Sequence, residues 1–177
     1  VPTLVHNLYS TYYTVAFYRG FTPYGKNERQ PRQALNASPN MPCENVAVYR
    51  KQWDQFYSAL ARGGKATALW DVDPDLAARL DHARFSSSLD PNLPILDFGC
   101  GTGQQTAWLS DNYSCVLGLD VSQTAIGMAL QHHNRDNVEF RVADQTNPEF
   151  YSDLQSEYGD MNVYVRGVLH QILAEHR

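Results

Sequence analysis

Alternate glycines that follow an acid are the feature of this chain with the clearest chemical potential. The residues run Asp97-Phe98-Gly99-Cys100-Gly101-Thr102-Gly103, directly after the apolar pair Ile95-Leu96. Glycine is needed where the backbone takes a positive φ, or where a ligand approaches closer than a Cβ would allow. The run therefore predicts a turn whose backbone can lie against a flat or extended ligand.

Further acids follow apolar segments later in the chain. Asp120 and Val121 come after one apolar run, and Asp144 and Gln145 come after a segment that alternates apolar and polar residues. A carboxylate at the carboxyl end of a strand, roughly 20 residues beyond a glycine loop, is placed to accept hydrogen bonds from ribose hydroxyls. An acid at the end of an apolar strand has little structural reason to be there, so we expect Asp120 to bind a ligand.

A doubly wound parallel sheet with helices on both faces would bring these residues together. Apolar and alternating runs predict strands over residues 95–98, 115–120, 138–142 and 161–166. Helices are expected from Gln104, after the cap Ser122 and from Asn147-Pro148. Repeated strand–helix units with short connections form parallel sheets. Ligands of such sheets bind beyond the carboxyl ends of the strands, where the three acids would gather.

The glycine pattern distinguishes between cofactor classes. A dinucleotide fingerprint would need glycine at Gln104 or Thr106, and no Gly-Lys-Ser/Thr follows as in a Walker loop. A nicotinamide oxidoreductase is therefore a distant alternative. The pattern acid-x-G-x-G-x-G resembles motif I of the class I S-adenosylmethionine-dependent methyltransferases. The segment from residue 161 to His170 is also similar to the fourth-strand segment of many small-molecule members of that family.

This resemblance implies S-adenosylmethionine as the cofactor and in-line transfer of its methyl group to an O, N or S nucleophile of a small molecule. It implies that Asp97 faces the cofactor's ammonium group, although capping of turn amides is an alternative. The remaining implied cofactor contacts are Gly99, Cys100, Gly101 and Gly103 in the loop, Asp120 with Val121 at the ribose, and Asp144 with Gln145 at the adenine.

Two further residues near the expected reaction centre are candidates. His170 has a pKa range that suits a catalytic base, and a structural role is equally open. Arg166 is expected among the cofactor-binding residues, and its charge could pair with an acidic substrate or with a nearby carboxylate. No cluster of His, Cys and Asp has metal-ligand spacing, so no metal is expected.

A helix is expected from Val46, because apolar residues recur at spacings of three and four until Gly63-Gly64. Trp53 and Tyr57, with Trp70 and Asp71, resemble the N-terminal cover of thiopurine-methyltransferase-like enzymes, whose aromatic residues close over the cofactor. The alternative is that these aromatic residues are simply core. Asp73-Pro74 predicts a second helix, with Leu76, Leu80 and Ala83 facing inward.

The chain departs from the family after Arg166, where one expected helix replaces the fifth to seventh strands. We therefore expect an N-terminal strand and linker over residues 1–42 and the cofactor-binding domain over 43–177. A fragment, a sheet completed by a second chain, and a rearranged strand order all remain open. In a rearranged order, the tyrosine-rich strand at residues 11–18 would stand in for a late strand.

Composition limits the remaining classes. The chain has 177 residues and a formal charge of −5, without a cluster of Lys and Arg, which argues against a nucleic-acid partner. No apolar run reaches the ~20 residues that cross a bilayer, so no membrane partner is expected. Three cysteines without a CxxC pair favour a reduced, cytoplasmic compartment. The alternative to a methyltransferase is an inactive cofactor-binding or interaction module that needs another chain to complete the fold. For either function, a homo-oligomer and a second chain that completes the sheet both remain open.

Overall fold

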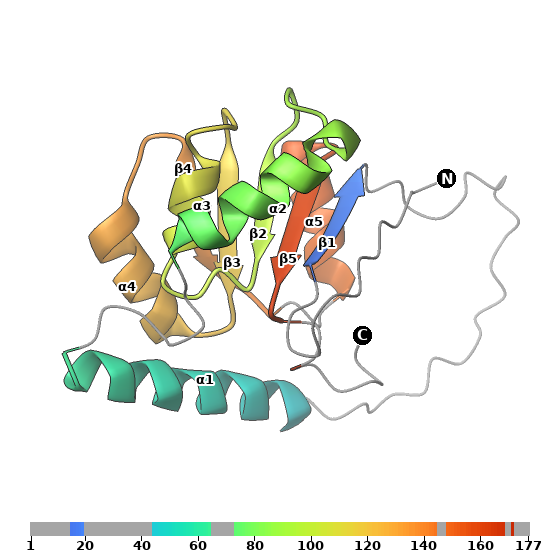
Figure 1. The fold of residues 1–177 in the computed structure, drawn as a ribbon. Helices are drawn as coiled ribbons and strands as arrows, with labels where there is room; N and C mark the ends of the chain where they lie inside the picture. The colour runs from blue at the N-terminus through green and yellow to red at the C-terminus, as the bar shows by residue number, and fades with distance from the viewer. Residues whose placement is uncertain (1–14, 20–43, 65–72, 145–147, 169–170, 172–177) are drawn as a thin grey trace, which may run out of the picture.

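The computed structural model describes residues 15–19, 44–64, 73–144, 148–168 and 171 (Figure 1). None of the helices in these ranges is long and apolar enough to cross a lipid bilayer. The elements in chain order are β1 (Val15–Arg19), α1 (Glu44–Arg62), the 3-10 turn η1 (Pro74–Leu76), α2 (Ala78–Phe85), the 3-10 turn η2 (Ser86–Ser88), β2 (Ile95–Phe98), α3 (Gln104–Leu109), β3 (Val116–Asp120), α4 (Gln123–His133), β4 (Val138–Val142), α5 (Pro148–Tyr158) and β5 (Asn162–Arg166).

The strands form one five-stranded sheet in the order β1-β5-β2-β3-β4. The four strands from β2 to β5 are parallel, with Ile95 of β2 opposite Val116 of β3 and Asn162 of β5. The chain adds β3 and β4 on one side of β2 and then places β5 on the other side. This reversal beside β2 is the switch point at which doubly wound sheets bind ligands. The predicted fold class is confirmed.

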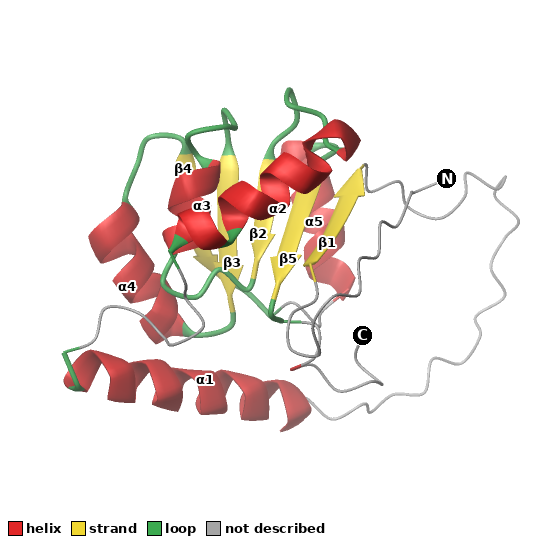
Figure 2. Ribbon diagram, in the orientation of Figure 1, coloured by secondary structure: helices red, strands yellow, loops and turns green. Residues whose placement is uncertain are grey.

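Helices cover both faces of the sheet, with α2, α3 and α4 on one face and α5 on the other (Figures 1 and 2). Every residue of β2 and β3 is buried, as expected for parallel strands covered on both sides. The first face packs Ile95, Val116 and Tyr164 against Phe85 and Leu109. The second packs Leu96, Leu117 and Leu119 against Leu154 of α5.

Helix α1 lies across the end of the sheet at which the parallel strands finish (Figure 1). Its bounds agree with the predicted apolar stripe, and it ends immediately before Gly63-Gly64. The carboxyl ends of β2, β3 and β5 therefore point toward this helix, so α1 covers the edge at which the glycine loop and the acids lie.

The N-terminal strand is part of the sheet. β1 runs antiparallel to β5, with Val15 opposite Arg166 and Arg19 opposite Asn162. The predicted strand at residues 11–18 therefore overlaps β1, while residues 11–14 and the predicted linker lie outside the described residues. A position outside the sheet would have excluded a rearranged strand order. That β1 replaces a late strand of the family stays a proposal.

The second predicted helix differs from its prediction in the direction of its apolar side chains. Leu76 and Leu80 are exposed by 68% and 48%, whereas Ala78 and Phe85 are buried. A 3-10 turn occupies residues 74–76, and Ala77 leaves helical geometry with φ −131° and ψ −89°. This break changes the phase of the helix, so the leucine spacing read across it does not define one face.

Candidate cofactor-binding site

The glycine loop between β2 and α3 has positive φ at all three of its glycines, with values of 76° at Gly99, 56° at Gly101 and 86° at Gly103. A Cβ at Gly99 would lie 2.2 Å from the side chain of Val168, and one at Gly103 would lie 2.8 Å from the ring of Phe140. Gly99 and Gly103 are therefore needed to avoid overlap with other side chains of the protein, whether or not a ligand also approaches the loop.

Cys100 is buried within the loop and packs against Ile126 and Ala129 of α4 and Phe140 of β4. Because Cys100 is enclosed by these apolar side chains, its small size accounts for its presence in the loop.

The loop is fastened to the end of β3 through its own backbone. The amides of Gly99 and Cys100 both donate to the carbonyl oxygen of Leu119, each at 2.8 Å. The next amide, that of Gly101, donates to Oδ2 of Asp120 at 3.0 Å. The amide of Gly103 donates to the carbonyl of Cys100 at 3.0 Å. These four amides thus face protein acceptors, unlike the outward-facing amides that cradle a phosphate.

Asp120 is buried at 7% exposure and holds two loops at once. Its Oδ2 accepts the Gly101 amide, and its Oδ1 accepts the amide of Ser122 at 2.9 Å. The assumption that an acid here has little structural reason is therefore wrong. The carboxylate joins the glycine loop to the start of α4, whatever ligand it also binds.

Asp97 is 3% exposed and accepts a 2.6 Å hydrogen bond from the hydroxyl of Thr106 in α3. Its neighbour Phe98 points to the opposite face of the sheet and stacks on Tyr151 of α5, with ring centroids 6.4 Å apart. Burial, and then the charge of Asp144, raise the pKa of the Tyr151 phenol. Because β2, β3 and β4 are parallel, Asp97 near the end of β2, Asp120 at the end of β3 and Asp144 just beyond β4 lie toward the same edge of the sheet.

Arg166 ends β5 at the same edge and forms an ion pair away from the loop. Its Nε lies 3.8 Å from Oδ2 of Asp81 in α2, and the two side chains are 16% and 15% exposed. The hydroxyl of Tyr164 donates to the same oxygen at 3.1 Å. Burial raises the pKa of Asp81, although Tyr164, Arg166 and Arg84 favour its carboxylate. Of the partners left open for Arg166, the structure shows a carboxylate.

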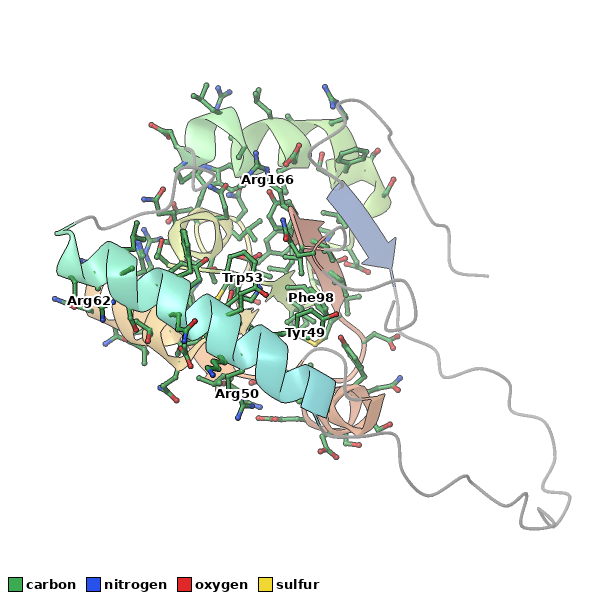
Figure 3. The ribbon with its side chains drawn as sticks, turned by 90° about the horizontal axis from the view of Figure 1, so that it is seen from below. Tyr49, Arg50, Trp53, Arg62, Phe98 and Arg166 are labelled. Atoms are coloured by element: carbon green, nitrogen blue, oxygen red, sulfur yellow. The ribbon has the colours of Figure 1, made fainter. Side chains whose placement is uncertain are left out.

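The aromatic residues of α1 divide into two groups. Figure 3 shows Tyr49 and Trp53 on the side of α1 toward Phe98 at the end of β2, whereas Arg50 projects from the other side. Tyr57 is 3% exposed and packs against Ala125 and Met128 of α4. Trp53 therefore lies over the predicted cofactor edge, while the described contacts of Tyr57 are core packing.

Several predicted features lie outside the described residues, namely the candidate base His170, the adenine contact Gln145, and Trp70 with Asp71. Val121 is described and follows Asp120 directly, half-buried. Within the described ranges no group of His, Cys, Asp and Glu is arranged to hold a metal ion. An open groove of about 580 Å³ contains none of the predicted site residues; it is lined by Asp73, Pro74, Gln104, Ala107, Trp108, Asp111, His133 and Arg135.

Sequence reasoning missed Asp54 of α1. Its Oδ1 accepts hydrogen bonds from the hydroxyl of Ser122 at 2.7 Å and from the amide of Thr124 at 3.0 Å. Ser58, one turn further along α1, lies 3.2 Å from the hydroxyl of Thr124. The sequence does contain a signal for this contact. Asp54 and Ser58 lie four residues apart beside the apolar stripe of α1, which indicates that this side of the helix contacts polar groups.

Comparison with known proteins finds similarity to methyltransferases. Residues 95–174 match the family model described as a methyltransferase domain. A solved structure of an S-adenosylmethionine-dependent methyltransferase from Anabaena variabilis is 33% identical, with a TM-score of 0.67 over 78% of this chain and 54% of that one. These matches confirm the predicted resemblance to S-adenosylmethionine-dependent methyltransferases, and the predicted class of cofactor agrees with it.

Curated relatives match over shorter stretches. Phosphoethanolamine N-methyltransferase 3 from Arabidopsis thaliana is 38% identical over 65 residues, or 35% of this chain and 13% of that enzyme. The phosphoethanolamine N-methyltransferase of Triticum aestivum is 39% identical over 61 residues, or 33% of this chain and 12% of that enzyme. The chain therefore spans about half of the Anabaena protein and a small part of the plant enzymes.

Proposed function

We propose that this chain binds S-adenosylmethionine at the carboxyl edge of its sheet and transfers the methyl group to a small-molecule O, N or S nucleophile. The supporting observation is the bonding of the glycine loop. Four of its amides face protein acceptors, and one acceptor is the carboxylate of Asp120. A pyrophosphate would meet a negative charge and few donors there, whereas hydroxyl and ammonium groups donate hydrogen bonds to carboxylates.

We expect the predicted residues along this edge to contact successive parts of such a cofactor. A carboxylate has about four acceptor positions, which is more than the two amide bonds at Asp120 use, so ribose hydroxyls can also bind there. Asp144 with Gln145 would contact the adenine, and Asp97 would contact the ammonium group. Trp53 on α1 would cover the methionyl end, where an aromatic face favours a cation.

The bound cofactor would supply an electrophilic methyl group on a sulfonium, which leaves as a neutral thioether when the carbon–sulfur bond breaks. The protein would hold the nucleophile in line with that carbon and exclude water through the cover provided by α1. His170 would take the proton from the attacking hydroxyl, amine or thiol. Replacement of His170 by Ala should lower turnover while leaving cofactor binding unchanged.

Calorimetric titration with S-adenosylhomocysteine tests the proposal. We expect binding by the intact chain, and a loss of about 10- to 100-fold in Asp120→Ala, because hydrogen bonds to a charged group contribute about 1.5–3 kcal/mol. Asp144→Asn should weaken binding less, and circular dichroism should establish that both variants are folded. A folded parent chain that does not bind would reject the proposal.

The second candidate is a module that binds the cofactor without transfer. Transfer of a labelled methyl group to a broad panel of acceptors separates the two. Phosphoethanolamine belongs in that panel, because two relatives carry it in their names. Binding without transfer to any acceptor would favour the module.

A further inference from the structure

Helices α1 and α4 are joined by hydrogen bonds as well as by apolar packing. Asp54 of α1 uses one carboxylate oxygen to accept from the Ser122 hydroxyl at 2.7 Å and from the Thr124 amide at 3.0 Å. Ser122 caps α4, since its hydroxyl oxygen also accepts the amide of Ala125 at 3.1 Å. The covering helix is therefore held by the first turn of α4, and not only by apolar packing.

The same turn is bonded to the predicted ribose-binding acid. The amide of Ser122 donates to Oδ1 of Asp120, and Oδ2 of Asp120 accepts the amide of Gly101 in the glycine loop. Four residues from four different segments thus form one continuous series of hydrogen bonds: Asp54, Ser122, Asp120 and Gly101. Displacement of α1 would remove an acceptor from Ser122, whose backbone orients the carboxylate of Asp120.

Apolar packing reinforces this contact and limits its position. Tyr57, one turn after Asp54, packs on Ala125 and Met128 of the same part of α4. Burial would raise the pKa of Asp54, but hydrogen bonds from Ser122 and Thr124 hold it below its usual value, so the group is ionised near neutral pH. The polar and apolar contacts together fix Trp53, the preceding residue, over the carboxyl ends of the strands.

We infer that Asp54 is a positioning residue that couples closure of α1 to cofactor binding at Asp120. The inference rests on the proposed function and adds to it how the site is covered. Because coupling between two events is reciprocal, the bound cofactor should strengthen the docking of α1, and docked α1 should tighten binding. The carboxylate of Asp54 accepts its hydrogen bonds from Ser122 and Thr124, so it would act on the cofactor through Ser122 and Asp120.

The experiment compares the intact chain with three variants. Calorimetry with S-adenosylhomocysteine gives the Kd, and hydrogen–deuterium exchange gives the protection of α1 with and without that compound. Asp54→Ala removes the acceptor. Asp54→Asn keeps an oxygen that can accept both hydrogen bonds. Gln55→Ala, at an exposed position of the same helix, is the matched control.

We expect the compound to increase protection of α1 in the parent chain. Asp54→Ala should weaken binding about tenfold, within the usual range of coupling, and abolish the added protection. Asp54→Asn and Gln55→Ala should retain both. Unchanged binding in folded Asp54→Ala, an equal loss in Asp54→Asn, or α1 protection that does not respond to ligand would each overturn the inference. A parent chain without any binding would instead reject the proposed function, and this inference with it.

Discussion

One carboxylate at the end of β3 accepts hydrogen bonds from backbone amides in two different loops. Asp120 is joined to Gly101 and Ser122, and this geometry requires an acceptor at both oxygens. An amide side chain offers one oxygen and one NH₂ group, and the latter would face a backbone N–H. Asp120 is therefore a structural residue even before any ligand binds.

Sequence reasoning found Asp120 by its place at a strand end but missed this bonding. The partner amide on Gly101 belongs to a backbone, which carries no residue-type signal. The glycines were predicted to be needed for two reasons, a positive φ and space for a ligand to approach the backbone. Positive φ applies to all three, whereas Val168 and Phe140 fill the space beside two of them.

The first residue-scale prediction separates backbone strain from side-chain overlap. Gly99→Ala combines a left-handed backbone with a Cβ 2.2 Å from Val168, whereas Gly159→Ala has φ +70° and nothing within 4 Å. We expect Gly159→Ala to lose about 1 kcal/mol and Gly99→Ala about 3 kcal/mol in denaturant unfolding, since overpacking adds to strain. Val168→Ala should partly rescue Gly99→Ala. Equal losses at the two glycines would contradict the overlap.

The second residue-scale prediction concerns pH. Burial against the rings of Trp108 and Tyr113 lowers the pKa of His82 from its usual 6.5. The unfolded chain then binds the proton first, so stability is fully present above pH 6.5 and falls as the pH decreases toward the lower folded value. Urea unfolding between pH 7.5 and 5 should show this slope, and His82→Phe should reduce it. An identical slope in the variant would refute the assignment.

At the scale of elements, the central strands were predictable because parallel strands buried on both faces appear as short apolar runs. The direction of the apolar side chains of α2 could not be predicted in this way, because a 3-10 turn interrupts the helical period at Ala77. The element on which α1 docks could not be predicted from the apolar periodicity of the helix either. A stripe shows which side of a helix is buried, but not which neighbour buries it.

The element-scale prediction addresses that docking. Tyr57→Ala should cost about 3 kcal/mol, because the ring is 3% exposed and packs on Ala125 and Met128. Limited trypsin digestion should then cut α1 more rapidly at Arg50 and Lys51, which are exposed on it. The exposed substitution Gln55→Ala should leave both measurements unchanged. A tyrosine-to-alanine variant with parent-like stability would show that α1 is held mainly by its polar contacts.

For the whole molecule, the parallel core of β2 to β5 followed from the sequence, while the position of β1 did not. An edge strand forms hydrogen bonds on one side only, and its apolar alternation fits several edges equally well. The proposed domain limits at residues 42 and 43 depend on whether β1 belongs to the same folding unit as β5.

Truncation tests this. Removal of residues 1–43 would leave the backbone groups of β5 that face β1 without their partner. We expect the shortened protein to be less stable and to self-associate through the exposed edge, as measured by light scattering after size-exclusion chromatography. A truncated chain that stays monomeric and as stable as the parent would show that residues 1–43 are a dispensable extension.

The pairing of β1 with β5 also sets an order of events during synthesis. Of the described strands, β1 is synthesised before the others and pairs with β5, which is synthesised after them, so this pair cannot form until the strands between them have emerged. Closing such a distant pair is slow, and the early strand remains exposed to wrong partners until then. The units from β2 to β4 can assemble meanwhile, which makes attachment of β1 a late step that depends on β5.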